Sequence, residues 1–462
     1  MEKGKTEFKN QIDMTSGGLL KKILVFALPI ALSSVLQQLF NSVDIAVVGN
    51  FASSSALAAV GSNAPVINLF INLFVGLSVG ANVVIAGFIG SNKNDKIKQA
   101  VSTSFIIALF SGIALLVAGE IAAEPILTAM GAPSDVIDLA AIYLRIYFLG
   151  MPFFMIYNFG SAILRSVGDT KRPMYILAAC GGVNALLNLW FVIGFNMSAD
   201  GVATATVISN GLSAYLIIRI LRKENEPLKL NLRELKIDKK ILRQVLAIGV
   251  PAGLQGVVFS ISNVFIQTCL NGFGSAVVAG SAAAVNFEYF NYYIINAFGQ
   301  SAVTFTSQNY GAGKLQRCLK SFFTAFALAA VSSLALTAVF MIFRNEFLSF
   351  YTNDAEIIPY GLERMQHIIV YGALISTYEV SACAMRGFGY SNTPTILTVL
   401  GTCVLRIVWI FTVFKNDPDY GVLLDVYPVS WLITGIACLA AYAVIYKRVK
   451  NKSGFDMQRT AA

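Results

Sequence analysis

The chain has 462 residues, of which 56% are hydrophobic and only 13% are charged, and its mean hydropathy is +0.67. A soluble globular protein would carry about 25% charged residues, so the composition excludes that class. The apolar residues form long continuous runs instead of alternating ten-residue segments, which excludes a transmembrane β-barrel. We therefore predict an all-α polytopic membrane protein.

Turn residues and charged residues divide the apolar runs into twelve segments. Each segment is long enough to cross roughly 30 Å of hydrocarbon as a helix. The predicted spans are 21–48, 57–89, 97–122, 136–163, 173–195, 201–221, 241–270, 277–309, 318–343, 357–384, 393–415 and 426–446.

The distribution of Lys and Arg predicts how these spans are oriented. If the N-terminus is cytoplasmic, the inner segments hold 29 of the 34 Lys and Arg residues, and the outer loops hold only Arg344 and Lys415. Cytoplasmic loops of membrane proteins are enriched in Lys and Arg. We therefore expect a protein of the plasma (inner) membrane with both termini in the cytoplasm. The net charge of +9 then indicates topology and attraction to anionic lipids, not nucleic-acid binding.

The two halves of the chain resemble each other at a nearly constant offset. Pro29 and Asn41 align with Pro251 and Asn263 at an offset of 222, and "AILRSVGDTKRP" aligns with "CAMRGFGYSNTP" at an offset of 221. Because each half holds an even number of spans, both halves cross the membrane in the same direction, as a parallel repeat of two six-helix lobes. The predicted organisation is a cytoplasmic tail at 1–20, an N-lobe at 21–221, a cytoplasmic linker at 222–240, a C-lobe at 241–446 and a cytoplasmic tail at 447–462.

Asp44 is a carboxylate in the middle of the apolar first span, and no Lys or Arg lies near it in the sequence. An intramembrane carboxylate is costly and is a functional candidate for that reason. Asn188 in the fifth span and Thr206 in the sixth lie at a similar predicted depth. Oxygen ligands at one depth suit a hard cation such as Na⁺, or a carboxylate that exchanges a proton. The predicted cation-coupling site contains Gln37, Asn41, Asp44, Asn184, Asn188 and Thr206. The alternative is a purely structural hydrogen-bond hub.

The eighth span contains a second acid, Glu288, within "NFEYFNYYIINAFGQ". An acid among aromatic rings fits a lipophilic cation through charge attraction and cation–π contact. The predicted substrate cavity contains Asn286, Glu288, Tyr289, Tyr292, Tyr293 and Gln300. An interfacial tyrosine belt is the alternative. His367, the only histidine, is a candidate proton relay, with packing or hydrogen bonding as the alternative.

Several stretches together resemble the multidrug and toxic compound extrusion (MATE) transporters. They are "ALPIALSSVLQQLFNSVDIAVVG" in the first span, "AILRSVGDTKRP" after the fourth, "NALLNLWFVIGF" in the fifth, "GVATATVIS" in the sixth and "QNYGAGK" after the eighth. The resemblance implies a V-shaped pair of six-helix lobes and export of cationic aromatic compounds driven by H⁺ or Na⁺. It also implies a cation site at Asp44, Asn184, Asn188 and Thr206. Many members have aspartate where this chain has Asn188, so this chain has one carboxylate fewer.

The expected function is therefore a cation-coupled antiporter that works by alternating access. Its expected partners are small organic substrates and membrane lipids, the coupling ion is H⁺ or Na⁺, and we expect no other cofactor and a monomer. A lipid-linked oligosaccharide flippase of the wider superfamily is the alternative. The sequence contains no HExxH, GxSxG or P-loop motif, which disfavours an enzyme.

Overall fold

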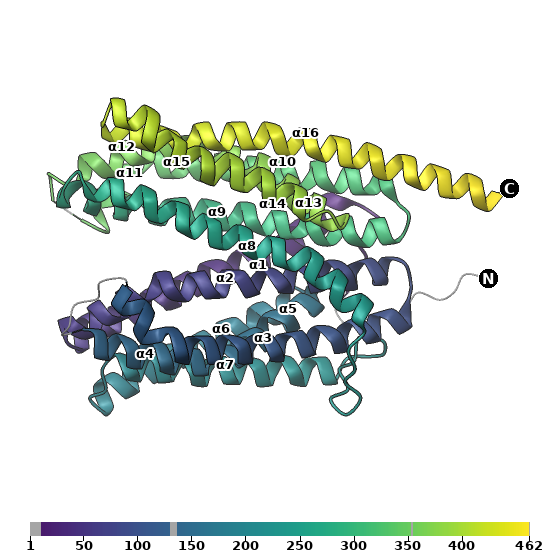
Figure 1. Ribbon diagram of the computed structural model, residues 1–462, viewed down its shortest axis with the longest axis horizontal. Helices are drawn as coiled ribbons and strands as arrows, with labels where there is room; N and C mark the ends of the chain where they lie inside the picture. Colours follow the sequence, from purple (N-terminus) through teal and green to yellow (C-terminus); the bar gives the residue numbers. More distant parts are fainter. Residues whose placement is uncertain (1–10, 130–135, 353, 462) are drawn as a thin grey trace. The chain divides into compact units, whose positions relative to one another are not determined.

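The computed structural model describes residues 11–129, 136–352 and 354–461, and every regular element in these ranges is helical (Figure 1). Residues 1–10 of the predicted N-terminal tail lie outside the described residues, as does the last residue of the predicted C-terminal tail.

The first half contains α1 (Leu19–Phe51), α2 (Ser54–Gly90), α3 (Asn94–Ala129), α4 (Ile137–Leu149), α5 (Met151–Ser166), α6 (Lys171–Leu189), the π-helical turn η1 (Trp190–Gly194) and α7 (Ala199–Arg222). The second half begins with α8 (Lys239–Asn271), α9 (Ser275–Gly311), α10 (Leu315–Ile342) and the short α11 (Arg344–Ser349). It continues with α12 (Ile358–Ile368), the 3₁₀ turn η2 (Ile369–Leu374), α13 (Ile375–Gly387), α14 (Asn392–Thr398), the π-helical η3 (Val399–Val404), α15 (Leu405–Trp409), the π-helical η4 (Ile410–Phe414) and α16 (Tyr420–Ala461).

All twelve predicted spans coincide with helices or with helices joined through a short turn, so the predicted fold class is confirmed. Among the described residues, ten helices are long and apolar enough to cross a membrane, and α4 with α5 forms an eleventh span bent by 44°. The remaining predicted span, 277–309, is α9, which is long enough at 37 residues but rich in polar side chains. The bend between α4 and α5 falls at Gly150, directly before the Met151–Pro152 pair that opens α5. Proline cannot donate to the helical ladder, so the chain changes direction there.

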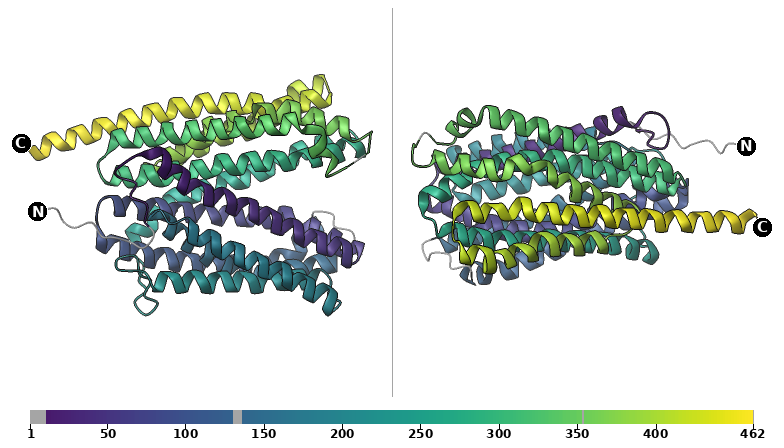
Figure 2. Two further views of the ribbon diagram at one scale, coloured as in Figure 1. Left: turned by 180° about the vertical axis from the view of Figure 1, so that it is seen from behind. Right: turned by 90° about the horizontal axis from the view of Figure 1, so that it is seen from above.

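The helices group into two compact units, and the division cuts through two of the helices. Unit 1 contains Leu32–Gly253 with the described part of Met1–Asp13, and unit 2 contains Met14–Ala31 and Leu254–Ala462. The first part of α1 therefore belongs to unit 2, and the first part of α8 belongs to unit 1. Within each unit the axes of the long helices are roughly aligned with one another (Figures 1 and 2).

In unit 1, the first part of α8 packs closely on α2 through small residues. A Cβ atom added to Gly76 would lie 2.2 Å from the backbone nitrogen of Gly253, and one added to Gly80 would lie 2.3 Å from the carbonyl oxygen of Val245. Gly76 and Gly80 are one helical turn apart, as are Gly249 and Gly253. Small residues at this spacing let two membrane helices approach until their backbones touch.

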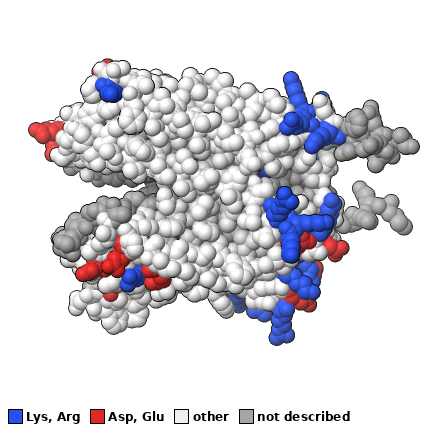
Figure 3. All heavy atoms as spheres, in the orientation of Figure 1, with Lys and Arg blue, Asp and Glu red and all other residues white. Residues whose placement is uncertain are grey.

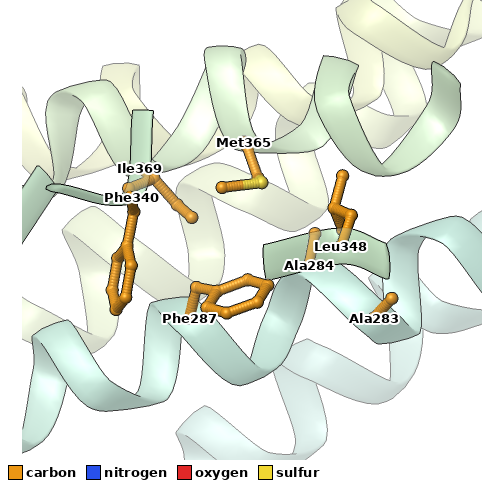
Figure 4. Packing of buried hydrophobic residues seen from close by; sticks show 7 residues of the cluster. All are labelled: Ala283, Ala284, Phe287, Phe340, Leu348, Met365 and Ile369. Carbon is orange, nitrogen blue, oxygen red and sulfur yellow. The ribbon is translucent and has the colours of Figure 1, made fainter. Parts of the chain in front are cut away.

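Unit 2 has a dense aromatic and aliphatic core at one end of α9. It contains Ala283, Ala284, Phe287, Phe340, Leu348, Met365 and Ile369, drawn in Figure 4. The rings of Phe287 and Phe340 lie with their centroids 5.1 Å apart. The first part of α1 joins this unit through Phe26, whose ring meets Phe305 of α9 edge to face at 5.7 Å. These contacts fix the helices that carry the polar side chains described below.

Each unit also binds the residues directly before the helix part that it takes from the other half of the chain, which is the first part of α1 in unit 2 and the first part of α8 in unit 1. In unit 2, Arg317 donates from Nε to the carbonyl oxygen of Met14 at 2.9 Å and from Nη1 to that of Gly17 at 2.9 Å. In unit 1, the backbone nitrogen of Asp238 donates to Thr103 Oγ1 at 3.0 Å. The backbone N–H groups of Ile241 and Lys240, together with the Lys96 ammonium, hold the pKa of the Asp238 carboxyl below its usual range.

Charged side chains on the visible face of each unit gather toward the ends of the helices (Figure 3). Most of the surface between the ends carries no Lys, Arg, Asp or Glu, and Lys and Arg dominate at one end. An uncharged band along bundled helices is the surface that a bilayer requires.

Candidate functional site

Asp44 in unit 1 begins a chain of hydrogen-bonded side chains that joins three helices. Asn188 Nδ2 on α6 donates to Asp44 Oδ1 on α1, and it also lies 3.3 Å from Asn184 Oδ1. Asn184 Nδ2 donates to Thr206 Oγ1 on α7 at 3.3 Å, and the Thr206 hydroxyl donates to the carbonyl oxygen of Val202 at 3.0 Å. The structure thus brings four of the six predicted coupling residues into one continuous chain.

The local sequence of α6 explains why α1 comes close enough to complete this chain. Asn184 and Asn188 are one helical turn apart and share a face. Gly181 precedes Asn184 by three residues on the same helix. A Cβ atom added to Gly181 would lie 1.9 Å from Phe40 Cε2 of α1. Only glycine leaves room for that ring. Directly after Asn188 the helix widens into η1, and π-helical turns are frequent at functional sites.

The charge of Asp44 has no cationic partner among the described residues, and the side chain is only half-buried. Asn188 is fully buried, at 0% exposure, and its Oδ1 atom has no hydrogen-bond partner within the described ranges. Turning the Asn188 amide around would place that oxygen against the Asp44 carboxylate and the Asn184 oxygen. An ionised Asp44 therefore holds the amide in the observed orientation, whereas a protonated Asp44 would itself be a donor.

Two predicted members of this site lie outside the chain. Gln37 and Asn41 are exposed and contribute no hydrogen bond to it. Two residues that the sequence did not single out lie near Asp44 instead, because the phenols of Tyr143 and Tyr147 on α4 interact electrostatically with its carboxylate. Their rings stack at a centroid distance of 6.0 Å. Tyr143 and Tyr147 follow Asp44 by 99 and 103 positions and lie on another helix. Helical spacing therefore cannot assign them to the Asp44 site.

Glu288 in unit 2 is not a free carboxylate, because an arginine pairs with it. Arg364 on α12 binds it with two hydrogen bonds, from Nε to Oε1 at 2.6 Å and from Nη2 to Oε2 at 3.1 Å. Arg364 Nη1 also donates to Ser281 Oγ at 2.8 Å. Arg364 is 4% exposed, so the pair is a buried, bidentate salt bridge. Both residues lie in predicted spans, at 277–309 and 357–384, but the sequence does not indicate that they form a pair.

The other predicted cavity residues are spread along α9. Tyr289 and Tyr292 are exposed, and the rings of Tyr289 and Tyr293 stack at 6.2 Å. Asn286 Nδ2 donates to the carbonyl oxygen of Ala282 in its own helix at 3.1 Å. Gln300 is half-buried two turns further on. The tyrosines therefore form an aromatic stripe beside the neutralised Glu288.

A second buried acid of unit 2, Glu379 on α13, was not among the predicted site residues. It is 6% exposed and accepts a hydrogen bond from Asn296 Nδ2 at 3.1 Å. Tyr292 lies close enough to interact electrostatically with it. Its position inside a predicted span was the only signal available from the sequence.

His367 lies on α12 and contacts an acid at the start of α16. His367 Nδ1 is 2.7 Å from Asp425 Oδ1, and the two side chains are 33% and 46% exposed. Glu363, one turn earlier on α12, also interacts electrostatically with His367. The structure thus gives His367 an acidic partner, and its role as a proton relay stays a prediction.

Comparison with known proteins decides the family. A sequence model described as MatE matches residues 29–214 and 251–412. The chain belongs to the MATE family. The matched ranges cover both halves of the internal repeat and include Asp44, Asn184, Asn188, Thr206 and Glu288.

Named MATE relatives span nearly the whole chain. A probable multidrug resistance protein, YoeA of Bacillus subtilis (strain 168), is 26% identical over 439 residues, or 93% of this chain and 94% of that protein. The multidrug export protein MepA of Staphylococcus aureus (strain MSSA476) is 21% identical over 93% of this chain and 94% of its own length. A solved outward-facing multidrug resistance MATE transporter superposes with a TM-score of 0.90 at 23% identity, covering 96% of this chain and all of that one. The fold is therefore that of a MATE transporter.

Proposed function

We propose that this protein is an ion-coupled antiporter that exports lipophilic organic compounds, including cationic ones, across the plasma membrane. Family membership makes it an integral membrane transporter, since the members of this family are transporters rather than enzymes. The multidrug names of its relatives support a broad substrate range for this chain. We further propose that both termini are cytoplasmic, that the protein works as a monomer, and that it needs no cofactor besides the coupling ion.

The observation that carries this proposal is the chain Asp44–Asn188–Asn184–Thr206. It contains one carboxylate without a cationic partner, and it ends in neutral amides and a hydroxyl. Such a carboxylate can bind and release a cation while its neighbours reorganise by small rotations. Since the chain links α1, α6 and α7, a change in the charge of Asp44 alters the contacts among three helices.

The orientation of Asn188 favours H⁺ over Na⁺ as the coupling ion. Its Nδ2 group points at Asp44, so an N–H donor occupies the side of the carboxylate where a sodium ion would need an oxygen. Na⁺ binding would also require several further oxygen ligands. A proton needs only Asp44 itself.

Coupling follows if the coupling ion and the substrate have different affinities for the inward-open and outward-open states. A ligand shifts a conformational equilibrium only through such a difference. Protonation of Asp44 from outside would favour release of substrate outward, and deprotonation inside would reset the protein. The exposed tyrosines Tyr289 and Tyr292 and the half-buried Tyr293 offer aromatic surface to a lipophilic compound.

The test is ethidium efflux from proteoliposomes with a proton gradient or a sodium gradient imposed separately. We expect efflux with the proton gradient, and its loss in Asp44→Asn. Glu124→Gln is the matched control, because it removes a carboxylate of the same unit whose side chain is 65% exposed. Wild-type efflux rates in Asp44→Asn would overturn the coupling role, and efflux driven only by sodium would overturn the choice of ion.

One observation favours the flippase alternative as a second candidate. Among the described residues, unit 2 buries three arginines, Arg364, Arg386 and Arg406, at 4%, 6% and 2% exposure. Glu288 neutralises only Arg364, and the two remaining cations suit a pyrophosphate-linked lipid. Translocation of a fluorescent lipid-linked oligosaccharide in the same proteoliposomes, without ethidium efflux, would support this candidate against drug export.

A further inference from the structure

Arg406 is a buried cation deep within a membrane span. It lies on α15, eight residues before the end of the span at Phe414, or about 12 Å along the helix axis. That distance exceeds the reach of its side chain, so Arg406 cannot bring its charge to the membrane surface. The residue is 2% exposed and therefore faces the interior of unit 2.

Every hydrogen bond that the structure gives to the Arg406 side chain is made to a neutral group. Nε donates to Ser430 Oγ at 3.3 Å, and Nη1 donates to Asn263 Oδ1 at 3.5 Å. Nη2 makes no hydrogen bond to any described residue. Arg406 also forms no salt bridge with a described carboxylate. An unpaired charge inside a membrane protein is expensive, and its retention needs a reason.

Aromatic rings cover the faces of the guanidinium, and Nη2 is the atom on its edge that makes no hydrogen bond to a described residue. Arg406 Cζ lies 4.4 Å from the ring centroid of Tyr427 and 5.8 Å from that of Phe259. Arg364 shares the Tyr427 ring at 5.4 Å, but its charge is already matched by Glu288. Of the two guanidinium groups beside Tyr427, only that of Arg406 has capacity left for an anion.

We propose that Arg406, with Tyr427 and Phe259, forms a binding site for the carboxylate of an aromatic organic acid or zwitterion. The edge of the guanidinium matches a carboxylate in a planar arrangement of two hydrogen bonds. The neighbouring rings provide surface for the aromatic part of the same ligand. Asn263, which accepts the hydrogen bond from Nη1, is exposed, so the polar side of the site reaches the surface of unit 2. The inference rests on the proposed transport function only in treating this ligand as a transported compound.

The test compares two aromatic probes of nearly equal size that differ in charge, the anion 1-naphthoate and the neutral 1-naphthamide. Equilibrium binding is measured on the purified full-length protein in detergent, without any gradient. We expect 1-naphthoate to bind roughly tenfold more tightly than 1-naphthamide, and Arg406→Gln to remove that preference. Equal affinities for the two probes in the wild type, or an unchanged preference in Arg406→Gln, would overturn the proposal.

A second variant keeps the test decisive if Arg406→Gln fails to fold. Asn263→Asp places a carboxylate next to Arg406 without changing the size of the side chain. We expect this variant to lose the preference for 1-naphthoate while its melting temperature rises, because the internal carboxylate satisfies the buried charge. Retention of the preference would contradict an anion site at Arg406. Arg145→Gln, which removes a half-exposed arginine of unit 1, is the control and should keep the preference.

This experiment separates the two proposals from each other. Loss of gradient-driven efflux with an intact carboxylate preference would reject the export function and leave the anion site standing. Asp44-dependent efflux without any carboxylate preference would reject the anion site alone.

Discussion

In unit 1 the segment from α6 to η1 faces a lone carboxylate, whereas the corresponding segment of unit 2, residues 392–414, carries a lone guanidinium. With the repeat offset of 221, Asn184 and Asn188 correspond to Leu405 and Trp409, the residues on either side of the turn that carries Arg406. The position that corresponds to Asp44 is near Ile266. Both segments nevertheless keep a π-helical turn at the same place, η1 and η4.

This difference shows that the repeat has kept its backbone and changed its charges. A helix irregularity is set by hydrogen-bond register and packing, so it survives when side chains at the site diverge. The unpaired charge at the first of these segments is negative, and that in the second is positive. The two segments are therefore suited to different ligands, a coupling cation in one and an anionic group in the other.

The largest expected effect comes from breaking the salt bridge that neutralises Glu288. Arg364→Gln would leave the partly buried Glu288 carboxylate unpaired and should cost about 3 kcal/mol of stability, the lower end of the range for a fully buried pair. The double variant Arg364→Gln with Glu288→Gln should recover most of the loss, because no charge remains. Thermal unfolding of the four proteins of this cycle checks the coupling. Strictly additive losses would show that the two side chains do not act as a pair.

A packing change at the contact of α1 with α6 should affect unit 1 next. Gly181→Ala forces the Phe40 ring away and should destabilise the protein by about 1–3 kcal/mol through overpacking. Gly182→Ala is the matched control, because nothing lies within 4 Å of a Cβ atom added there. Melting temperatures should therefore fall for the first variant and stay level or rise for the second. Equal shifts would mean that the close contact does not position α1.

The role of Asp44 as the single carboxylate of the chain Asp44–Asn188–Asn184–Thr206 can be tested by adding a second carboxylate to this chain. Asn188→Asp places two carboxylates side by side and should raise the affinity for Na⁺ by roughly tenfold, since carboxylate count tunes cation affinity. The combination of Asn188→Asp with Asp44→Asn restores one carboxylate and should lose the gain. Equilibrium binding of radioactive Na⁺ measures both. An unchanged affinity in Asn188→Asp would show that the chain cannot reorganise around a metal ion.

The smallest effect is expected at the far end of the same chain. Thr206→Ala removes the acceptor of Asn184 Nδ2 and should cost about 0.5–1.5 kcal/mol, because one neutral hydrogen bond is lost. Ethidium efflux should slow only a few-fold. A loss as complete as that expected for Asp44→Asn would move the coupling function from the carboxylate to the whole chain.

The fold was largely predictable, because long apolar runs and the Lys and Arg bias report directly on membrane spans. The 3₁₀ and π-helical turns that interrupt the α-helices were not predictable. The turns at 190–194, 369–374 and 410–414 depend on which carbonyl each N–H selects, and hydropathy carries no information on that choice.

For the site, equal depth and the family resemblance were enough to group Asp44 with Asn188 and Thr206. The Arg364–Glu288 pair was not predictable, although both residues are charges within predicted spans. They are 76 residues apart on different helices, and helical periodicity gives the face of a residue but not its partner. Arg406 was likewise visible as a charge within a span, but only its neutral surroundings show that its charge is unmatched.

The division of α1 and α8 between the units has a consequence for how the protein is made. Unit 1 lacks part of its packing until residue 253 has been synthesised, on the order of 10–50 s after the start at usual translation rates. Leu19–Ala31 emerges first but belongs with helices that are translated after residue 254. Neither half can therefore mature on the ribosome independently of the other. A chain severed within 222–238 would give two fragments that each hold a segment required by the other, so function after such a cut would depend on the fragments finding each other in the bilayer.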